Sequence, residues 1–277
     1  SFYKYYEMTK MLLILTYAIG IYALLVLFLF FFQRSYLYFP SKEKIDVSYF
    51  IDSGLKEIEL TTSDGLVLKS WFKKPSKQDG YTILIFHGNA GHVGHRVEKF
   101  KRFITAGYGF LFLEYRGYGG NPGKPTEGGL YYDALSALEF LSKQQISSDK
   151  TILYGESLGC GVAVKLSSEA AFAATVLEAP FTSIADVAQR HFWYLPAKWL
   201  VLDRYDILRI IGNIKSPLLV IHGEKDNIIN ISLGKKIFDA APQPKEALFV
   251  PNAGHNNLFE FNVEEKLLIF LEKQKNY

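Results

Sequence analysis

This sequence is poor in cysteine and has no concentration of basic residues. The 277 residues contain a single cysteine, Cys160, so no intramolecular disulfide can form and the fold must rest on its hydrophobic core. The formal net charge is only +3 and no long run of lysine and arginine occurs, which argues against nucleic acid as a partner. Low-complexity segments are also lacking, and 49% of hydrophobic residues is too high for a disordered chain.

Apolar residues are in excess, and many of them lie in one segment, residues 11–32. These 22 residues carry no charge, and as a helix they would extend roughly 33 Å, enough to cross the hydrocarbon core of a bilayer. A buried core helix of this length is rarely apolar on every side. The apolar part of a signal peptide is normally shorter and ends at small residues rather than at Phe30–Phe32. We therefore predict a single-pass transmembrane anchor with the bilayer as a partner; its flanking charges nearly balance and predict no orientation.

The rest of the chain is predicted to form one domain. The predicted segments are an N-terminal flank (1–10), the anchor (11–32), a linker (33–54) and the domain (55–277). Two alternating segments around the turn at Ser63–Gly65 predict an antiparallel hairpin. Short and almost continuous apolar runs follow, which are typical of parallel strands buried on both faces. These runs are residues 82–87, 109–115, 151–155, 174–179, 217–223 and 247–251.

Segments with helical periodicity separate these runs. Leu130, Ala134, Leu138 and Leu141, for example, would share one face of a helix. The alternation predicts an α/β fold with a mostly parallel doubly wound sheet, preceded by the antiparallel hairpin. Ligands of such sheets bind beyond the carboxyl ends of the strands, so candidate site residues are expected there.

Ser157 lies between Gly155 and Gly159, where a predicted strand meets a predicted helix. A sharp strand-to-helix turn forces an unusual backbone conformation on such a serine and accepts only small neighbours. It also exposes the hydroxyl at the helix N-terminus, where backbone N–H groups favour a developing negative charge. A glycine-rich turn with a capping serine is the alternative. The context favours a nucleophile at Ser157, with Gly155 and Gly159 as the elbow glycines.

A serine nucleophile needs a base, and His255 is the best placed of the six histidines. It lies in the loop between the last predicted strand and the final helix, at the same sheet edge as Ser157. Asp226 and Glu224 follow the preceding strand at that edge, and either carboxylate could orient the histidine. We predict Asp226 as the orienting acid, with Glu224 as the alternative.

An oxyanion hole would complete the site. The residue after the nucleophile, Leu158, is expected to donate one backbone N–H. The second donor is expected in the loop after the strand at 82–87, where Asn89 is the first choice and Ala90 the alternative. A phosphate-binding loop is the rival interpretation of these glycines, but the Gly-Lys-Ser/Thr ending that it requires is missing.

These motifs together resemble the α/β-hydrolase superfamily over roughly residues 55–272. The segments that carry the resemblance are HGNAGHVGHR, LEYRGYGGNPGKPTEGGLYYDA, GESLG, HGEKDNII and NAGHNNLFE. They are most similar to the membrane-anchored α/β-hydrolase domain-containing proteins of the type 13-like branch, with types 12 and 17 as more distant relatives. The chain order of nucleophile, acid and base also agrees. Glu114 departs from the pattern, which has aspartate there, and Glu156 occupies a variable position.

The resemblance implies a serine hydrolase acting on small-molecule esters, thioesters or acyl lipids through an acyl-enzyme. Such a mechanism needs no metal and no organic cofactor. A carboxylate nucleophile, as in dehalogenases, is excluded by Ser157 at the elbow. Two alternatives stay open: a serine peptidase, since the prolyl oligopeptidase group shares this fold, and a non-catalytic membrane scaffold that retains it.

The insertion at residues 181–216 is expected to govern substrate choice. It is rich in large apolar side chains, and Trp193, Tyr194 and Trp199 are the candidate substrate-binding residues. One interpretation is a small cap that forms an apolar acyl pocket or a patch resting on the membrane. The other is a helix packed onto the sheet. The nearby anchor favours a lipid or acyl-chain substrate.

Overall fold

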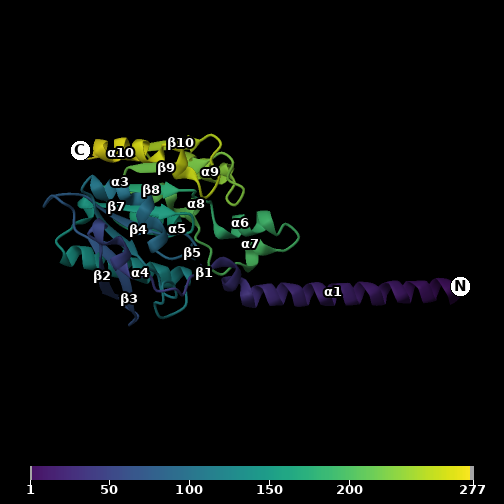
Figure 1. Cartoon of the computed structure of the whole chain (residues 1–277). Helices are drawn as coiled ribbons and strands as arrows, with labels where there is room; N and C mark the ends of the chain where they lie inside the picture. Colours follow the sequence, from purple (N-terminus) through teal and green to yellow (C-terminus); the bar gives the residue numbers. More distant parts are fainter. Residues whose placement is uncertain (1, 275–277) are drawn as a thin grey trace.

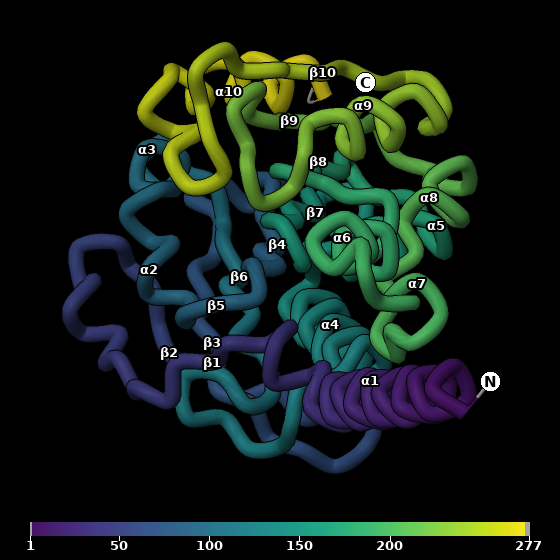
Figure 2. The backbone as a smooth tube through the Cα atoms, turned by 90° about the vertical axis from the view of Figure 1, so that its right-hand side faces the viewer, coloured from purple at the N-terminus to yellow at the C-terminus, as the bar shows by residue number. Residues whose placement is uncertain are grey.

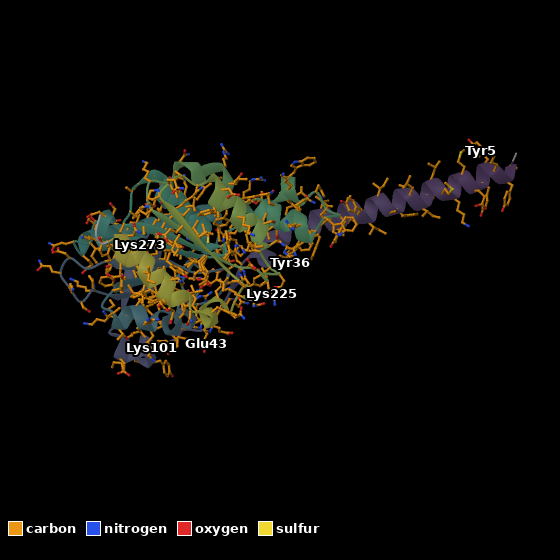
Figure 3. All side chains as sticks on the ribbon, turned by 90° about the horizontal axis from the view of Figure 1, so that it is seen from above. Tyr5, Tyr36, Glu43, Lys101, Lys225 and Lys273 are labelled. Carbon is orange, nitrogen blue, oxygen red and sulfur yellow. The ribbon has the colours of Figure 1, made fainter. Side chains whose placement is uncertain are left out.

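A helix of 36 residues, α1 (Phe2–Leu37), extends away from the rest of the protein in the computed structural model, which describes residues 2–274 (Figure 1). None of its residues is buried, and among the described residues it is the one helix long and apolar enough to cross a membrane. The predicted anchor 11–32 lies within it. Figure 3 shows Tyr5 near the far end of this helix and Tyr36 where the helix meets the domain.

Eight strands form one sheet in the order β10-β9-β8-β7-β4-β6-β3-β2. They are β2 (Lys56–Thr61), β3 (Val67–Lys73), β4 (Thr82–Phe86), β6 (Gly109–Leu113), β7 (Thr151–Glu156), β8 (Ala174–Glu178), β9 (Leu218–Gly223) and β10 (Lys245–Val250). β2 and β3 form an antiparallel hairpin, β3 pairs antiparallel with β6, and the other neighbours are parallel. The predicted α/β class, with a mostly parallel sheet and an N-terminal antiparallel hairpin, is confirmed.

Helices cover both faces of this sheet (Figures 1 and 2). The α-helices of the domain are α2 (Gly94–Val97), α3 (Lys101–Thr105), α4 (Glu127–Lys143), α5 (Gly159–Glu169), α6 (Ile184–His191), α7 (Ala197–Leu200), α8 (Ile207–Ile210), α9 (Ile231–Ala240) and α10 (Val263–Gln274). The 3₁₀ helices are η1 (Val47–Ser53), η2 (Glu98–Phe100), η3 (Ser148–Lys150), η4 (Ile211–Asn213) and η5 (Leu258–Phe261).

Two clusters of buried apolar side chains lie on the opposite faces of the sheet. Leu130 of α4 and Val162 of α5 belong to the first, and Phe103 of α3 and Leu267 of α10 to the second. Alternate residues of β4 and β6 enter one cluster or the other, because successive side chains of a strand point to opposite faces. This is why these strands are apolar at almost every position.

The segment between α1 and the sheet is held against the domain, although the sequence predicts a linker at 33–54. Its first residues continue α1, and β1 (Phe39–Pro40) then pairs in parallel with β5 (Ala90–Gly91) in the loop after β4. Ser1 and residues 275–277, which the predicted flank and domain include, lie outside the described residues.

Polar contacts fix the end of α1 to the loop that follows β4. The side-chain amide of Asn89 donates a hydrogen bond to the carbonyl of Leu37 (2.7 Å), one of the last carbonyls of the helix. Next to it, the buried hydroxyl of Tyr38 hydrogen-bonds the hydroxyl of Tyr205 (2.9 Å). The loop after β4 therefore joins α1 to the sheet, and this is the same loop in which the sequence predicts an oxyanion donor.

The predicted insertion 181–216 contains a helical hairpin of α6 and α7, followed by α8. Ser183 caps α6 by accepting a hydrogen bond from the backbone N–H of Asp186 (3.0 Å). The hairpin projects from the sheet and lies beside the end of α1 nearest the domain (Figures 1 and 2). We refer to the α6–α7 hairpin and its following turn, residues 184–202, as the cap.

Candidate active site

Ser157 sits on a tight turn between β7 and α5, in the left-handed region of backbone conformation with φ of 50°. For a residue other than glycine this conformation costs on the order of 1–3 kcal/mol and is retained where the surroundings enforce it. A Cβ on Gly155 would lie 2.7 Å from the Cα of Cys160, and a Cβ on Gly159 would lie 2.0 Å from the carbonyl oxygen of Phe86. Both glycines are therefore required by close backbone packing, in agreement with a nucleophile elbow.

The structure brings His255 and Asp226 together. The Nδ1 of His255 lies 2.7 Å from Oδ2 of Asp226 and donates to it, which leaves Nε2 of the ring for another partner. The second oxygen of Asp226 accepts the backbone N–H groups of Ile228 and Ile229 (2.9 and 2.8 Å). Glu224, the alternative acid, is exposed to solvent. The loop after β9 thus aims a buried carboxylate at the histidine of the loop after β10.

A second histidine, His222 at the end of β9, supports the same carboxylate. Its Nε2 donates to the carbonyl of Ile229 (2.8 Å) and lies 3.3 Å from Oδ2 of Asp226. Burial alone would raise the pKa of Asp226, but hydrogen bonds from His222, His255 and the Ile229 N–H hold this pKa well below its ordinary value. Asp226 therefore carries its negative charge throughout the neutral pH range.

Ser157 and His255 line the same cavity, although among the described residues no hydrogen bond joins them. Such bonds are often long in ligand-free enzymes and shorten when substrate binds. The loop after β4 lies against the elbow, since a Cβ on Gly88 would be 3.6 Å from the Cβ of Ser157. Asn89 and Leu158 line this cavity with them, and the N–H groups of both are without a protein acceptor in the described part of the chain.

A partly buried charge network next to Ser157 is the largest feature that the sequence analysis missed. Glu156 accepts hydrogen bonds from Arg96 (2.8 Å) and Lys99 (3.0 Å), and Lys99 also bonds Glu178. Burial would raise the pKa of Glu156, but the charges of Lys99 and Arg96 hold it well below its ordinary value. The other departure from the family pattern, Glu114, accepts the N–H of Val93 (3.0 Å) from a buried position.

Two cavities of different character meet at Ser157 and His255. The first, of about 470 Å³, is mainly apolar and is lined by α1, the cap and the elbow. The second, of about 530 Å³, is lined by polar and charged side chains that include His95, Arg96 and Asn256. A molecule bound across both would place an apolar part on one side of the serine and a polar part on the other.

The three predicted substrate-binding residues are not part of either cavity lining. Trp193 and Trp199 are 79% and 85% exposed, and Tyr194 is also exposed, because the tip of the cap turns these side chains outward. Other cap residues, including Val187 and Leu195, face the apolar cavity instead. The cap does line the site, but through the opposite face from the one that the sequence suggested.

Similarity to known proteins extends over most of the domain. The model of the family described as serine aminopeptidase, S33, matches residues 78–205. An uncharacterized protein of Mycobacterium tuberculosis is 38% identical over 234 residues, which are 84% of this chain and 83% of that protein. Protein bem46 of Schizosaccharomyces pombe is 34% identical over 221 residues, 73% of this chain and 72% of its own.

A lipase and solved esterases are also among the similar proteins. Lysophosphatidylserine lipase ABHD12 of Danio rerio is 35% identical over 195 residues, which are 63% of this chain and 51% of the lipase. The Pyrococcus furiosus esterase Pf2001 superposes with a TM-score of 0.69 at 20% identity, covering 87% of this chain and 98% of the esterase. The α/β hydrolase GrgF from Penicillium gives 0.67 at 19% identity, over 80% and 99% of the two chains. At these identities, the solved structures establish the fold.

Proposed function

Because this chain belongs to the α/β-hydrolase superfamily, we propose that it is a membrane-anchored serine hydrolase that cleaves ester, thioester or acyl-lipid bonds. Ser157 is the nucleophile, His255 the base and Asp226 the acid that orients it. The observation that carries this proposal is the 2.7 Å hydrogen bond between His255 and Asp226 beside a cavity that also contains the strained Ser157. The helix α1 is the anchor in this proposal.

The chemistry follows from this arrangement. Nε2 of His255 takes the proton of the Ser157 hydroxyl while its oxygen attacks the carbonyl carbon, and Asp226 stabilises the imidazolium that forms. The backbone N–H groups of Leu158 and Asn89 stabilise the oxyanion. His255 then gives its proton to the leaving group, and an acyl-enzyme forms. Water activated by His255 hydrolyses this ester and regenerates Ser157.

The two cavities suggest how a substrate lies. The apolar cavity suits an acyl chain, and the polar cavity beside His95, Arg96 and Asn256 suits a polar leaving group. Lysophospholipids have this division, and a relative named for lysophosphatidylserine hydrolysis supports their choice as first substrates. A monoacyl lipid with a polar headgroup is therefore the substrate class that we propose.

Labelling with a fluorophosphonate probe tests the nucleophile. The wild-type protein in detergent or nanodiscs is expected to label, and Ser157→Ala is expected not to label while keeping its thermal transition. A folded wild-type protein that fails to label would support the non-catalytic scaffold instead.

A substrate panel tests the class of bond that is cleaved. It compares short and long p-nitrophenyl esters, lysophospholipids, acyl thioesters and aminoacyl or dipeptide amides. We expect lysophospholipids and long-chain esters to be turned over fastest. Preference for the amides would instead favour the peptidase alternative, which the name of the matching family model also suggests.

A further inference from the structure

One face of α1 is turned toward the cap, from the second half of the segment predicted to cross the bilayer to the end of the helix. Val26, Leu29, Phe30, Gln33 and Leu37 are partly buried and line the apolar cavity, at the spacing that places residues on one face of a helix. Most of the remaining residues in these turns are exposed. The helix is therefore a wall of the cavity as well as a connection to the membrane.

Hydrogen bonds attach the cap along this part of α1. The hydroxyl of Tyr22 donates to the carbonyl of Tyr194 at the tip of the cap (2.9 Å). The Gln33 side chain bonds the backbone of the cap at two points, donating to the Leu200 carbonyl (3.2 Å) and accepting the Leu202 N–H (2.8 Å).

An ion pair joins α1 and the chain after the cap one residue further along the helix. Nε of Arg34 lies 2.8 Å from Oδ2 of Asp203. Together with the hydrogen bonds, it holds the cap alongside the helix over several turns.

The contact at Tyr22 sets the depth of the cap. Tyr22 is near the middle of the uncharged segment 11–32, about 15 Å along the helix axis from Phe32 at 1.5 Å per residue. This is about half of the 30 Å hydrocarbon core that the segment is long enough to cross. A helix that crosses the bilayer therefore takes the tip of the cap into the leaflet nearest the domain.

The outer surface of the cap is suited to that position. Phe192, Trp193, Tyr194, Trp199 and Leu202 are all exposed, and Trp193 and Trp199 are the two most exposed of these. Residues 192–202 contain one charged side chain, Lys198. A lysine can extend its charged end toward the headgroups along an apolar stem. In water this aromatic patch would be unfavourable, whereas lipid would cover it.

We infer that residues 192–202 of the cap are immersed in the leaflet next to the domain, and that the apolar cavity takes the acyl chain of a lipid directly from that leaflet, between α1 and the cap. This inference rests on the proposed function, because the chain must reach Ser157 to be cleaved. The substrate's apolar tail then stays in an apolar environment from the bilayer to the site. The polar headgroup of the substrate then lies in the second, polar cavity.

Intrinsic fluorescence tests the immersion of the cap, because the protein has three tryptophans and two of them are in the cap. The third, Trp71, is buried in β3. The 277-residue chain is placed in nanodiscs of phosphatidylcholine whose acyl chains carry bromine. We expect most of the cap emission to be lost relative to unbrominated lipid. The matched Trp193→Phe, Trp199→Phe double variant should show almost no loss. Equal emission from the wild-type protein in the two lipids would overturn the immersion.

A bulky substitution in the wall tests the route of the acyl chain. Leu29→Trp narrows the cavity, whereas Phe28→Trp changes a neighbouring exposed residue that does not line it. We expect Leu29→Trp to lower turnover of a palmitoyl lysophospholipid by about tenfold. Hydrolysis of a butyryl ester and fluorophosphonate labelling should stay within about twofold of wild type, as should every activity of Phe28→Trp.

The readouts separate the two proposals. Unchanged palmitoyl turnover in Leu29→Trp, or an equal loss in Phe28→Trp, would overturn the route while labelling still supports the nucleophile. Loss of labelling in the wild-type protein would instead overturn the proposed function, whatever the fluorescence shows.

Discussion

The carboxyl edge of the sheet and the wall that α1 and the cap form together enclose the same cavity, but they are built differently. At the edge, Asp226 is buried and bonded by backbone and histidine donors, and Gly159 fits against a backbone carbonyl with no room for a methyl group. At the wall, side chains of α1 contact the cap through a few hydrogen bonds, and Arg34, whose side chain is half exposed, pairs with Asp203 directly after the cap. In the mechanism that we propose, the edge carries out the chemistry and the wall selects the acyl chain.

The largest expected effect concerns the edge. Asp226→Asn should lower kcat by about ten-thousand-fold, because the amide favours the wrong tautomer of His255. The loss should be the same for short and long esters, since the wall is untouched. Esterase assays at both chain lengths check this, with the exposed Glu224→Gln as the matched control. A loss confined to long esters would contradict the division between edge and wall.

Close packing at the elbow predicts the next largest effect. Gly159→Ala should destabilise the fold by more than about 3 kcal/mol, because its Cβ would collide with the carbonyl of Phe86 and a backbone atom cannot move aside easily. Gly128→Ala in α4 meets no atom within 4 Å and should leave stability unchanged or raise it by up to about 1 kcal/mol. Thermal melts of the two variants provide the measurement. Equal melting temperatures would contradict the close packing of Gly159 against the carbonyl of Phe86.

The charge network predicts a loss of stability that depends on pH. Lys99→Met leaves Glu156 and Glu178 without their shared cation, so the pKa of Glu156 should rise. A carboxylate with a depressed pKa adds stability above the ordinary glutamate value of about 4.3, and this contribution disappears as the pH falls. The gap in melting temperature between wild type and Lys99→Met should therefore be widest near neutral pH and should close mainly below pH about 4, as the pH falls toward the depressed pKa of Glu156. Lys101→Met, at a pair exposed on the surface, should show almost no gap at any pH.

The smallest expected effect concerns the wall. Arg34→Ala removes the ion pair with Asp203 and should reduce turnover of long-chain esters several-fold, because the cap is then less well held against α1. Short esters and fluorophosphonate labelling should be unaffected. Lys42→Ala, at an exposed position outside the wall, is the control, and comparison of kcat/KM at two chain lengths is the measurement. Equal losses at both lengths would show that the wall also affects the chemistry.

Local patterns in the sequence were sufficient to predict the sheet and to locate the elbow. The apolar runs predicted the strands β4, β6, β7, β8, β9 and β10 to within a few residues, and all of these except β10 are buried on both faces, which removes polar residues from a strand. The alternating segments predicted β2 and β3. The predicted membership of the α/β-hydrolase superfamily is confirmed. The positions of Ser157, Asp226 and His255 at one edge followed from strand order, and their catalytic roles stay a prediction.

Local sequence patterns did not predict the contacts between segments that are distant in the chain. Gln33 and Leu202 are far apart in the chain, and nothing in either neighbourhood indicates that α1 reaches the cap. The direction of Trp193 and Trp199 could not be inferred either. Large aromatic residues usually point inward in water, but a cap beside an apolar helix can expose them. The network at Glu156 was missed because its cations come from a separate helical region.

The hydrogen bond from Asn89 to Leu37 has a practical consequence for anyone who prepares this protein. Cutting the chain after α1 to obtain a soluble fragment would remove the partner of the Asn89 side chain and one wall of the apolar cavity. Such a fragment would keep the Asp226–His255 pair, so it could report the reactivity of the serine. Under the proposed function, its preference among acyl chains would reflect a cavity without the α1 wall. Substrate profiling therefore calls for a chain that retains α1, placed in lipid.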